Sequence, residues 1–119
     1  MYRILIGGRS AMTEDLQRLL AGIRDFGWDE SKRETNLLDH QIDFLDVRGM
    51  FDDYTFIRRS DRHGEVRYQI FGYVQGQQIA VAFTIRGPIC RIISARPAKR
   101  DERRKYYHRL EGLSNQGKD

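Results

Sequence analysis

Four β-rich runs joined by short turns constrain the fold more than any other feature of this sequence. They are YTFIRR, VRYQIFGYV, QIAVAFTIR and ICRIISA, and they begin at residues 54, 66, 78 and 89. Gln75-Gly76-Gln77 and Gly87-Pro88 separate the last three runs at lengths typical of β-hairpins. Because tight turns allow only antiparallel pairing, the sequence predicts an antiparallel meander of about four strands.

The third run also predicts how the sheet is covered. Large apolar side chains alternate along it with polar or small ones, at Ile79, Val81, Phe83 and Ile85. Alternation with a period of two places these side chains on one face of the strand. We therefore expect an α+β protein in which the helices cover one face of the sheet.

Two elements are predicted at the start of the chain. Residues 2–6 form a short strand, and a helix follows with Thr13 as its N-cap. The apolar positions of this helix recur at helical spacing. They are Leu16, Leu19, Leu20 and Ile23.

Two further helices are predicted before the meander. Asp29 caps a helix over residues 30–40, in which Leu37 and Leu38 are expected to supply the apolar face. Asp43 caps the next helix, which ends at Asp52-Asp53. Its apolar positions, Phe44, Val47 and Phe51, again recur at helical spacing.

The positive charge of the chain is concentrated near its C-terminal end. Residues 91–109 hold eight Lys or Arg against Asp101 and Glu102, whereas the whole chain carries a net charge of only +4. This stretch begins as a strand, turns at Pro97 and is predicted to continue as a basic helix over residues 98–110. Two interpretations are open: a cationic surface that holds a polyphosphate ligand, or a solvated helix face.

Length and composition narrow the remaining possibilities. The 119 residues, 39% apolar and 32% charged, suit a single small globular domain. The single cysteine, Cys90, excludes an internal disulfide and a multi-cysteine zinc site. The three His lie far apart without metal-ligand spacing, so we expect neither a metal nor another cofactor. No apolar run is long enough to span a membrane and no signal sequence is visible, which makes the cytoplasm the expected location.

Several charged side chains can carry chemistry on a nucleic acid. Cleavage of RNA without a metal needs a base, an acid and cations that hold the phosphorane charge. His63, Glu65 and Glu102 are possible proton carriers. The arginines at positions 67, 91, 96 and 103 can hold phosphate in a bidentate manner. Base stacking can come from tyrosines, namely Tyr68, Tyr73, Tyr106 and Tyr107.

Each of these residues also has a purely structural interpretation. The role of Glu65 and Arg67 can be no more than an ion pair across strands, and that of Glu102 no more than to satisfy Arg96 or to balance the basic helix. Tyrosines in strands commonly pack within a sheet. The helical row of Lys32, Asn36 and His40 fits a solvated or partner-facing stripe.

The order of several motifs resembles the BrnT toxin family. The segment FGWDESK at residues 26–32, followed by Asn36 and His40, is similar to the opening of that family. The segments HGEVR at 63–67, TIRG at 84–87 and RIISARPA at 91–98 follow in the same order. They are followed by Glu102, Arg103 and Tyr106 at the family's spacing.

The resemblance implies a RelE-like microbial ribonuclease fold and a toxin of a type II toxin–antitoxin pair. Such a toxin cleaves RNA and arrests growth, a BrnA-like ribbon-helix-helix antitoxin neutralises it, and the complex binds operator DNA. It implies that the catalytic surface includes Glu65, Arg67, Arg91, Arg96 and Glu102. The candidate RNA-binding residues are His63, Lys99, Arg100, Arg103, Arg104 and Tyr106.

The same comparison divides the chain. Residues 1–22 precede the family pattern and are expected to form an N-terminal extension, 23–110 form the toxin domain, and 111–119 form a disordered tail. The alternative function is a non-catalytic module that grips a nucleic acid or an acidic partner through the basic helix.

Overall fold

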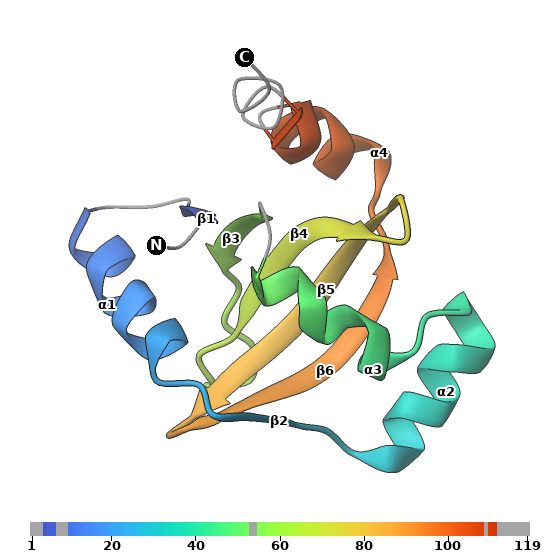
Figure 1. Cartoon of the computed structure of the whole chain (residues 1–119), viewed down its shortest axis with the longest axis horizontal. Coiled ribbons are helices and arrows are strands. Elements are labelled where there is room, and N and C mark those ends of the chain that lie inside the picture. The colour runs from blue at the N-terminus through green and yellow to red at the C-terminus, as the bar shows by residue number, and fades with distance from the viewer. Residues whose placement is uncertain (1–3, 7–9, 53–54, 109, 112–119) are drawn as a thin grey trace.

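A six-stranded sheet organises the protein, with the strand order β1-β3-β4-β5-β6-β2 (Figure 1). The computed structural model describes residues 4–6, 10–52, 55–108 and 110–111. The strands are β1 (Ile4–Ile6), β2 (Asp25–Gly27), β3 (Thr55–Arg59), β4 (Tyr68–Val74), β5 (Gln77–Arg86) and β6 (Ile89–Pro97). Strands β3 to β6 are antiparallel and consecutive, which confirms the predicted meander of four strands.

Two short parallel strands extend the meander at its edges. Strand β1 pairs with β3, and β2 pairs with β6. The first of these was expected over residues 2–6 and is observed over Ile4–Ile6, whereas residues 1–3 lie outside the described part. Strand β2 was not predicted, because its three residues carry no periodic pattern of their own.

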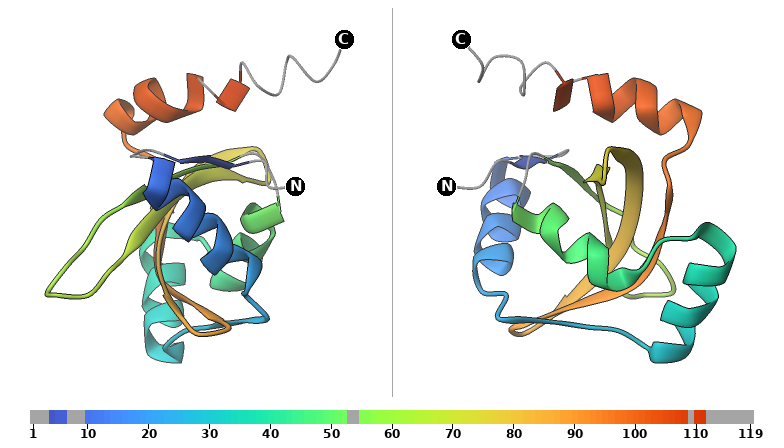
Figure 2. Two further views of the ribbon diagram at one scale, coloured as in Figure 1. Left: turned by 90° about the vertical axis from the view of Figure 1, so that its left-hand side faces the viewer. Right: turned by 45° about the vertical axis from the view of Figure 1, so that its right-hand side comes forward.

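Two-residue turns with two positive φ angles occur between β4 and β5 and in the connection from β3 to β4. Gln75 and Gly76 have φ angles of 52° and 79°, and His63 and Gly64 have φ angles of 52° and 76°. Two consecutive positive φ values are those of a type I′ turn, whose twist matches that of antiparallel strands. The turn at His63-Gly64 closes residues 60–67, which we call the projecting hairpin because it leaves the body of the sheet (Figure 2).

Three helical segments precede the meander. They are α1 (Ser10–Ala21), α2 (Glu30–His40) and α3 (Phe44–Val47), and a 3₁₀ turn over Arg48–Asp52 continues the last of them. The Asp29 carboxylate accepts a hydrogen bond from the Ser31 N–H at 2.9 Å, which confirms the predicted cap of α2. The N-cap predicted at Thr13 is wrong: α1 begins at Ser10, because Ala11 and Met12 are strong helix formers. The expected end of the third helix at Asp52-Asp53 is described only as far as Asp52, where the 3₁₀ turn ends, and Asp53 lies outside the described residues.

An asparagine, and not the predicted pair of leucines, attaches α2 to the sheet. Leu37 and Leu38 are 43% and 79% exposed. The buried residue is Asn36, whose amide donates to the Ile42 carbonyl and accepts from the Ala95 N–H, both at 3.0 Å. These hydrogen bonds anchor the helix, because Asn36 is its buried residue and faces the backbone of β6.

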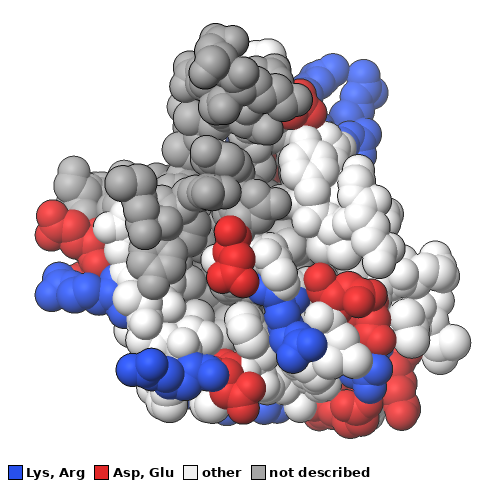
Figure 3. Space-filling model, in the orientation of Figure 1, with Lys and Arg blue, Asp and Glu red and all other residues white. Residues whose placement is uncertain are grey.

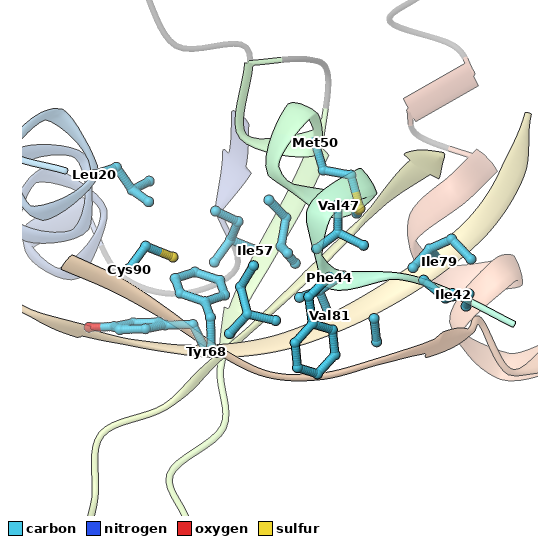
Figure 4. Close-up of a cluster of buried hydrophobic side chains, with 14 of the residues drawn as sticks. Leu20, Ile42, Phe44, Val47, Met50, Ile57, Tyr68, Ile79, Val81 and Cys90 are labelled. Atoms are coloured by element: carbon cyan, nitrogen blue, oxygen red, sulfur yellow. The ribbon is translucent and has the colours of Figure 1, made fainter. Parts of the chain in front are cut away.

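The main core lies on the face of the sheet that α1 and α3 cover (Figure 4). Leu16 and Leu20 of α1 and Phe44 and Val47 of α3 are buried there against alternate residues of the strands. The strand residues include Ile57, Ile70, Ile79, Val81, Phe83 and Ile92. The predicted apolar face of the third run is confirmed for Ile79, Val81 and Phe83, and Ile85 is partly buried beside them.

A second core on the opposite face corrects the expectation that helices cover one face only. Phe56, Phe71 and Ala80 are buried there under Tyr106 and Tyr107. These tyrosines belong to the C-terminal helix, which we define as α4 (Arg100–Glu102) and its continuation as a π-helix over Arg103–Tyr107. The prediction failed because small Ala80 and the aromatic residues of neighbouring strands form an apolar patch that no single strand displays.

The basic closing helix expected over residues 98–110 is confirmed, with its start at Arg100. The Tyr107 hydroxyl donates to the carbonyls of Gly72 and Ile79 at 2.9 and 2.6 Å, which fixes the helix on strands β4 and β5. The tail expected to be disordered lies, from residue 112 onward, outside the described part. Within the described residues, no helix is both long and apolar enough to cross a membrane.

Candidate nucleic-acid interface

The C-terminal helix covers one end of its sheet face and leaves the next row of residues partly exposed. The register aligns this row across four strands: Arg58 is opposite Gln69, Gln69 is opposite Ala82, and Ala82 is opposite Ser94. Arg58, Gln69 and Ala82 each lie two residues from a member of the second core, and Ser94 lies two residues from Arg96, which pairs with Ala80 of that core. Side-chain alternation therefore places all four on the side of the C-terminal helix. Short side chains at Ala82 and Ser94 leave the middle of this row open.

A β-bulge in β6 brings two arginines onto this same face. Arg91 and Arg96 are five residues apart, an odd spacing that would place them on opposite faces of a regular strand. Phe83 pairs with Ile92 and Ala82 pairs with Ser94, which makes Ile93 an extra residue. The bulge restores the phase, so that both arginines lie on the side of the C-terminal helix.

Arg58 is oriented between the sheet and the helix mainly by neutral partners. Its guanidinium donates to Gln69 Oε1 and to the Tyr106 hydroxyl, both at 2.8 Å. The same group lies 5.4 Å from the centre of the Phe71 ring. The Arg58 side chain is 39% exposed, and its nearest carboxylate oxygen, on Glu102, is 3.9 Å away. Its charge is therefore positioned but only weakly compensated.

Glu102 is held by a bidentate pair with Arg96. The two N–O distances are 2.8 and 2.9 Å, and the Lys99 N–H donates to the same carboxylate at 2.8 Å. Burial opposes ionisation of Glu102, but the hydrogen bonds from Arg96 and Lys99 outweigh it and lower the pKa of Glu102. The carboxylate is thus ionised and fully engaged, with its side chain only 10% exposed.

Glu65 holds a second cluster in the projecting hairpin, directly after its turn. It accepts from Arg67 at 2.8 Å and from Arg86 at 2.9 Å. These hydrogen bonds, first that from Arg86 and then that from Arg67, lower the pKa of Glu65. Arg86 and Ala80, the partner of Arg96, are six residues apart on β5, which separates the two clusters by roughly 20 Å. The predicted site is therefore an extended surface, and Arg96 does not contact Glu65.

We call this surface the arginine face, and it consists of Arg58, Arg67, Arg86, Arg91 and Arg96. Glu65 and Glu102 are the two carboxylates that pair with it, which leaves a net charge of +3. Arg91, half-buried opposite Thr84, forms no ion pair within the described residues. A phosphate chain therefore meets uncompensated charge at the centre of the face and paired charge at its ends.

Four more of the predicted cations are exposed along the C-terminal helix. Lys99, Arg100, Arg103 and Arg104 all reach solvent, and Figure 3 shows Lys and Arg side chains at the start of this helix. On the face viewed there, where α3 lies, acidic residues are mixed with basic ones. The helix thus adds positive charge beside the arginine face, whereas on the α3 side of the sheet acidic residues offset the basic ones.

Tyr106 and His63 are placed differently from what RNA binding would suggest. The Tyr106 ring is 8% exposed and stacks on Phe56 and Phe71 with centroids 4.5 and 4.4 Å away. Its ring is therefore occupied by the second core, and its hydroxyl serves Arg58. His63 is exposed in the turn of the projecting hairpin, two residues before Glu65, and its side chain forms no hydrogen bond or ion pair within the described residues.

Sequence reasoning missed Arg58 and Gln69. The available signal was the alternation of Phe56 with Arg58 and of Phe71 with Gln69, which predicts that each pair shares a face. The identity of that face became clear only once the second core was known, because each strand alone has two plausible buried sides. Tyr68, also considered for base stacking, is buried in the main core against Phe83.

The fold and this surface define a small α+β protein with a cationic sheet face suited to a polyanion. Residues 28–102 match the family model described as the ribonuclease toxin, BrnT, of a type II toxin–antitoxin system. The chain therefore belongs to the BrnT family, as its motifs suggested. No curated protein is similar enough to count as a match. The family implies an RNA substrate and an antitoxin partner.

Proposed function

We propose that this protein is an endoribonuclease toxin that cleaves RNA on the arginine face without a metal ion and thereby arrests growth in the cytoplasm. The observation that carries the proposal is the coincidence of a ribonuclease toxin family match with five arginines gathered on one sheet face. RNA is the polyanion that both observations favour.

The cations at the centre of the face suit stabilisation of the cleavage transition state. Arg91 has no ionic partner within the described residues, and Arg58 is aligned by the neutral groups of Gln69 and Tyr106. A preorganised cation that is not already neutralised gains most when negative charge develops on the phosphorane. We therefore assign Arg58 and Arg91 to the scissile phosphate, and Arg67 to a neighbouring phosphate.

The two glutamates have different proposed roles. Glu65, with a side chain 31% exposed, lies beside Arg67 and Arg86 and is the candidate proton acceptor. Its lowered pKa makes it ionised at neutral pH but a weak base, so most of the catalysis would come from the arginines. Glu102 is a positioning residue that acts through Arg96 and Arg58, because both of its oxygens are already engaged.

The exposed cations of the C-terminal helix supply long-range attraction for RNA. Lys99, Arg100, Arg103 and Arg104 lie beside the arginine face. Replacing any one of them with alanine should weaken RNA binding and leave the chemical step unchanged. His63 contacts RNA only if the RNA strand passes the turn of the projecting hairpin. The proposed antitoxin is a BrnA-like ribbon-helix-helix protein, and operator DNA is bound only by the joint complex.

Cleavage of RNA by the purified protein in excess EDTA tests the proposal. We expect Arg91→Ala to lower kcat by about 10²-fold or more, as the loss of one transition-state donor does in other enzymes. Arg48→Ala is the matched control, because Arg48 is an exposed arginine on the 3₁₀ turn that follows α3, beside the other face of the sheet. Equal activity of the two variants would show that the arginine face is not the active surface. Loss of all cleavage in EDTA would refute metal independence.

Growth after induced expression tests the toxin assignment. Growth should stop when the protein is produced alone and continue when a neighbouring ribbon-helix-helix gene is expressed with it. The alternative of a non-catalytic binding module predicts intact RNA at every time point and pH, together with binding that weakens steeply with salt. Unimpaired growth without the partner would contradict the toxin function.

A further inference from the structure

A cleft of about 740 Å³ lies beside Glu65, between α1 and the projecting hairpin. Its walls are mainly apolar and come from three parts of the chain: Leu16 and Leu19 of α1, Val66 of the hairpin, and Tyr68 and Ile85 of the sheet. Leu19 and Val66 are 42% and 41% exposed. Two large apolar side chains thus face solvent across the opening of a concave site whose size is typical of small-molecule pockets.

The cleft exists because the hairpin separates from β5. Pairing of β4 with β5 ends at Tyr68 and Phe83, whereas β5 continues to Arg86. Beyond that point Thr84 Oγ1 donates to the Val66 carbonyl at 2.8 Å, and Arg86 reaches Glu65. Within the described residues, the backbone of β5 from Thr84 to Arg86 has a strand partner only on the β6 side. Its other edge carries N–H and C=O groups that are free to bind a ligand.

We propose that this cleft binds one nucleobase of the RNA substrate, an inference that rests on the proposed function. A nucleobase has two apolar faces and a polar edge, which matches aliphatic walls around an unpaired strand edge. Arg59 and Arg86 also line the cleft, and the guanidinium N–H groups not used in their pairs with Asp61 and Glu65 can donate to base oxygen or nitrogen atoms. The ligand is therefore a single unstacked base rather than a duplex.

Glu65 connects this cleft to the arginine face. It lines the cleft, and it is also the carboxylate that holds Arg67 and Arg86. A base seated between Leu19 and Ile85 would place its own sugar and phosphate next to Glu65 and Arg67. The cleft then selects which phosphate of the RNA strand reaches the arginine face, and it acts as a specificity site for cleavage.

The N-terminal extension supplies one wall of the proposed base site. Leu16 and Leu19 belong to α1, which precedes the segment of residues 28–102 that matches the family model. Base preference therefore depends on residues outside the part of the chain that defines the family. The extension contributes to substrate choice and also, through buried Leu16 and Leu20, to the core.

Titration of the isotope-labelled full-length protein with each of the four nucleoside 5′-monophosphates tests the proposal, with ribose 5-phosphate as the base-free probe. We expect the amide resonances of Leu19, Val66 and Ile85 to shift with at least one nucleotide and not with ribose 5-phosphate. Leu19→Trp fills the cleft and should weaken that binding about tenfold or more. Leu37→Trp is the matched control, because Leu37 is 43% exposed and Leu19 is 42% exposed.

Three results would overturn the base site. Shifts confined to the arginine face, or an equal response to ribose 5-phosphate, would show that only phosphate is bound. Loss of antitoxin binding in Leu19→Trp, without nucleotide binding to the unaltered protein, would make the cleft a protein-docking pocket. RNA cleavage by a protein that fails this test leaves the proposed function intact. Base-dependent binding without cleavage supports the base site and refutes the ribonuclease.

Discussion

Replacing Glu102 with Gln keeps the size of a buried side chain and removes its charge. In the protein, one carboxylate oxygen accepts from both Arg96 and the Lys99 N–H, and the other accepts from Arg96 again. The amide of Gln retains one acceptor but directs an NH₂ group at a guanidinium. One of the two hydrogen bonds to Arg96 is therefore lost, and two donors face each other.

The expected loss of stability follows from the exposure of the two partners. Removing one member of a buried ion pair costs about 3–5 kcal/mol, because the remaining charge is left without a partner. The Arg96 side chain is 24% exposed and regains part of its hydration, whereas that of Glu102 is only 10% exposed. We expect Glu102→Gln to lower the free energy of unfolding by about 2–3 kcal/mol. For a domain of this size that corresponds to a fall in Tm of about 8–12 °C.

Thermal unfolding measured beside RNA cleavage distinguishes positioning from direct catalysis. Asp101→Asn is the matched control, because it makes the same charge change at an exposed neighbour in the first turn of α4. That control loses only a helix-terminus interaction of about 0.3–1 kcal/mol. A positioning role predicts that Glu102→Gln lowers Tm and kcat together while the shape of the pH–rate profile is preserved.

The opposite pattern would refute this reasoning. If Glu102→Gln melts within the range of Asp101→Asn yet loses cleavage, Glu102 acts on the substrate and not through Arg96. Loss of the acidic limb of the pH–rate profile in the same variant would identify Glu102 as the base.

Three further outcomes are expected. The pKa of Glu102 is lowered below its ordinary value of 4.5, so ionised Glu102 stabilises the fold above that pH and this stabilisation is lost as the pH falls further. Tm should therefore drop between about pH 5 and pH 3, and it should drop less in Glu102→Gln. Equal drops in the two proteins would contradict this. Gly72→Ala places a Cβ 2.9 Å from Thr55 Cγ2 and should destabilise by about 1–3 kcal/mol in urea unfolding, whereas Gly49→Ala meets nothing within 4 Å and should not. Burial raises the pKa of Cys90 to about 12, so iodoacetamide should label this thiol only after denaturation; rapid labelling of the native protein would show that the core opens there.

Local patterns were sufficient to predict the meander, the α2 helix and the short strand β1, but not strand β2 or the parallel pairing of either edge strand. The turn at Gln75-Gly76 and the cap at Asp29 depend on neighbouring residues only, and such signals are readable in the sequence. Strands β1 and β2 have three residues each, and their pairing depends on partners far along the chain. The second core was also invisible locally, because Ala80 becomes buried only when Tyr107 packs over its strand.

The candidate site was predicted in composition but not in geometry. Arg67 with Glu65 and Arg96 with Glu102 were each recognised as possible ion pairs, and both pairs are present. The two pairs lie at separate places on the sheet, because Arg96 lies at the far end of β6 from Arg86 and its partner Glu65. Which of these residues act on RNA stays a proposal.

The bulge at Ile93 makes chain length, rather than residue identity, the critical property of this part of the molecule. Deleting that one residue would leave every arginine in the sequence. On one side of the deletion, however, every side chain of β6 would move to the opposite face of the sheet. If the part before it turned, Cys90 and Ile92 would leave the core and Arg91 would take their place. A comparison that counts only matching residues would score this deletion as minor. A one-residue gap here should therefore weigh more than several substitutions elsewhere in the strand.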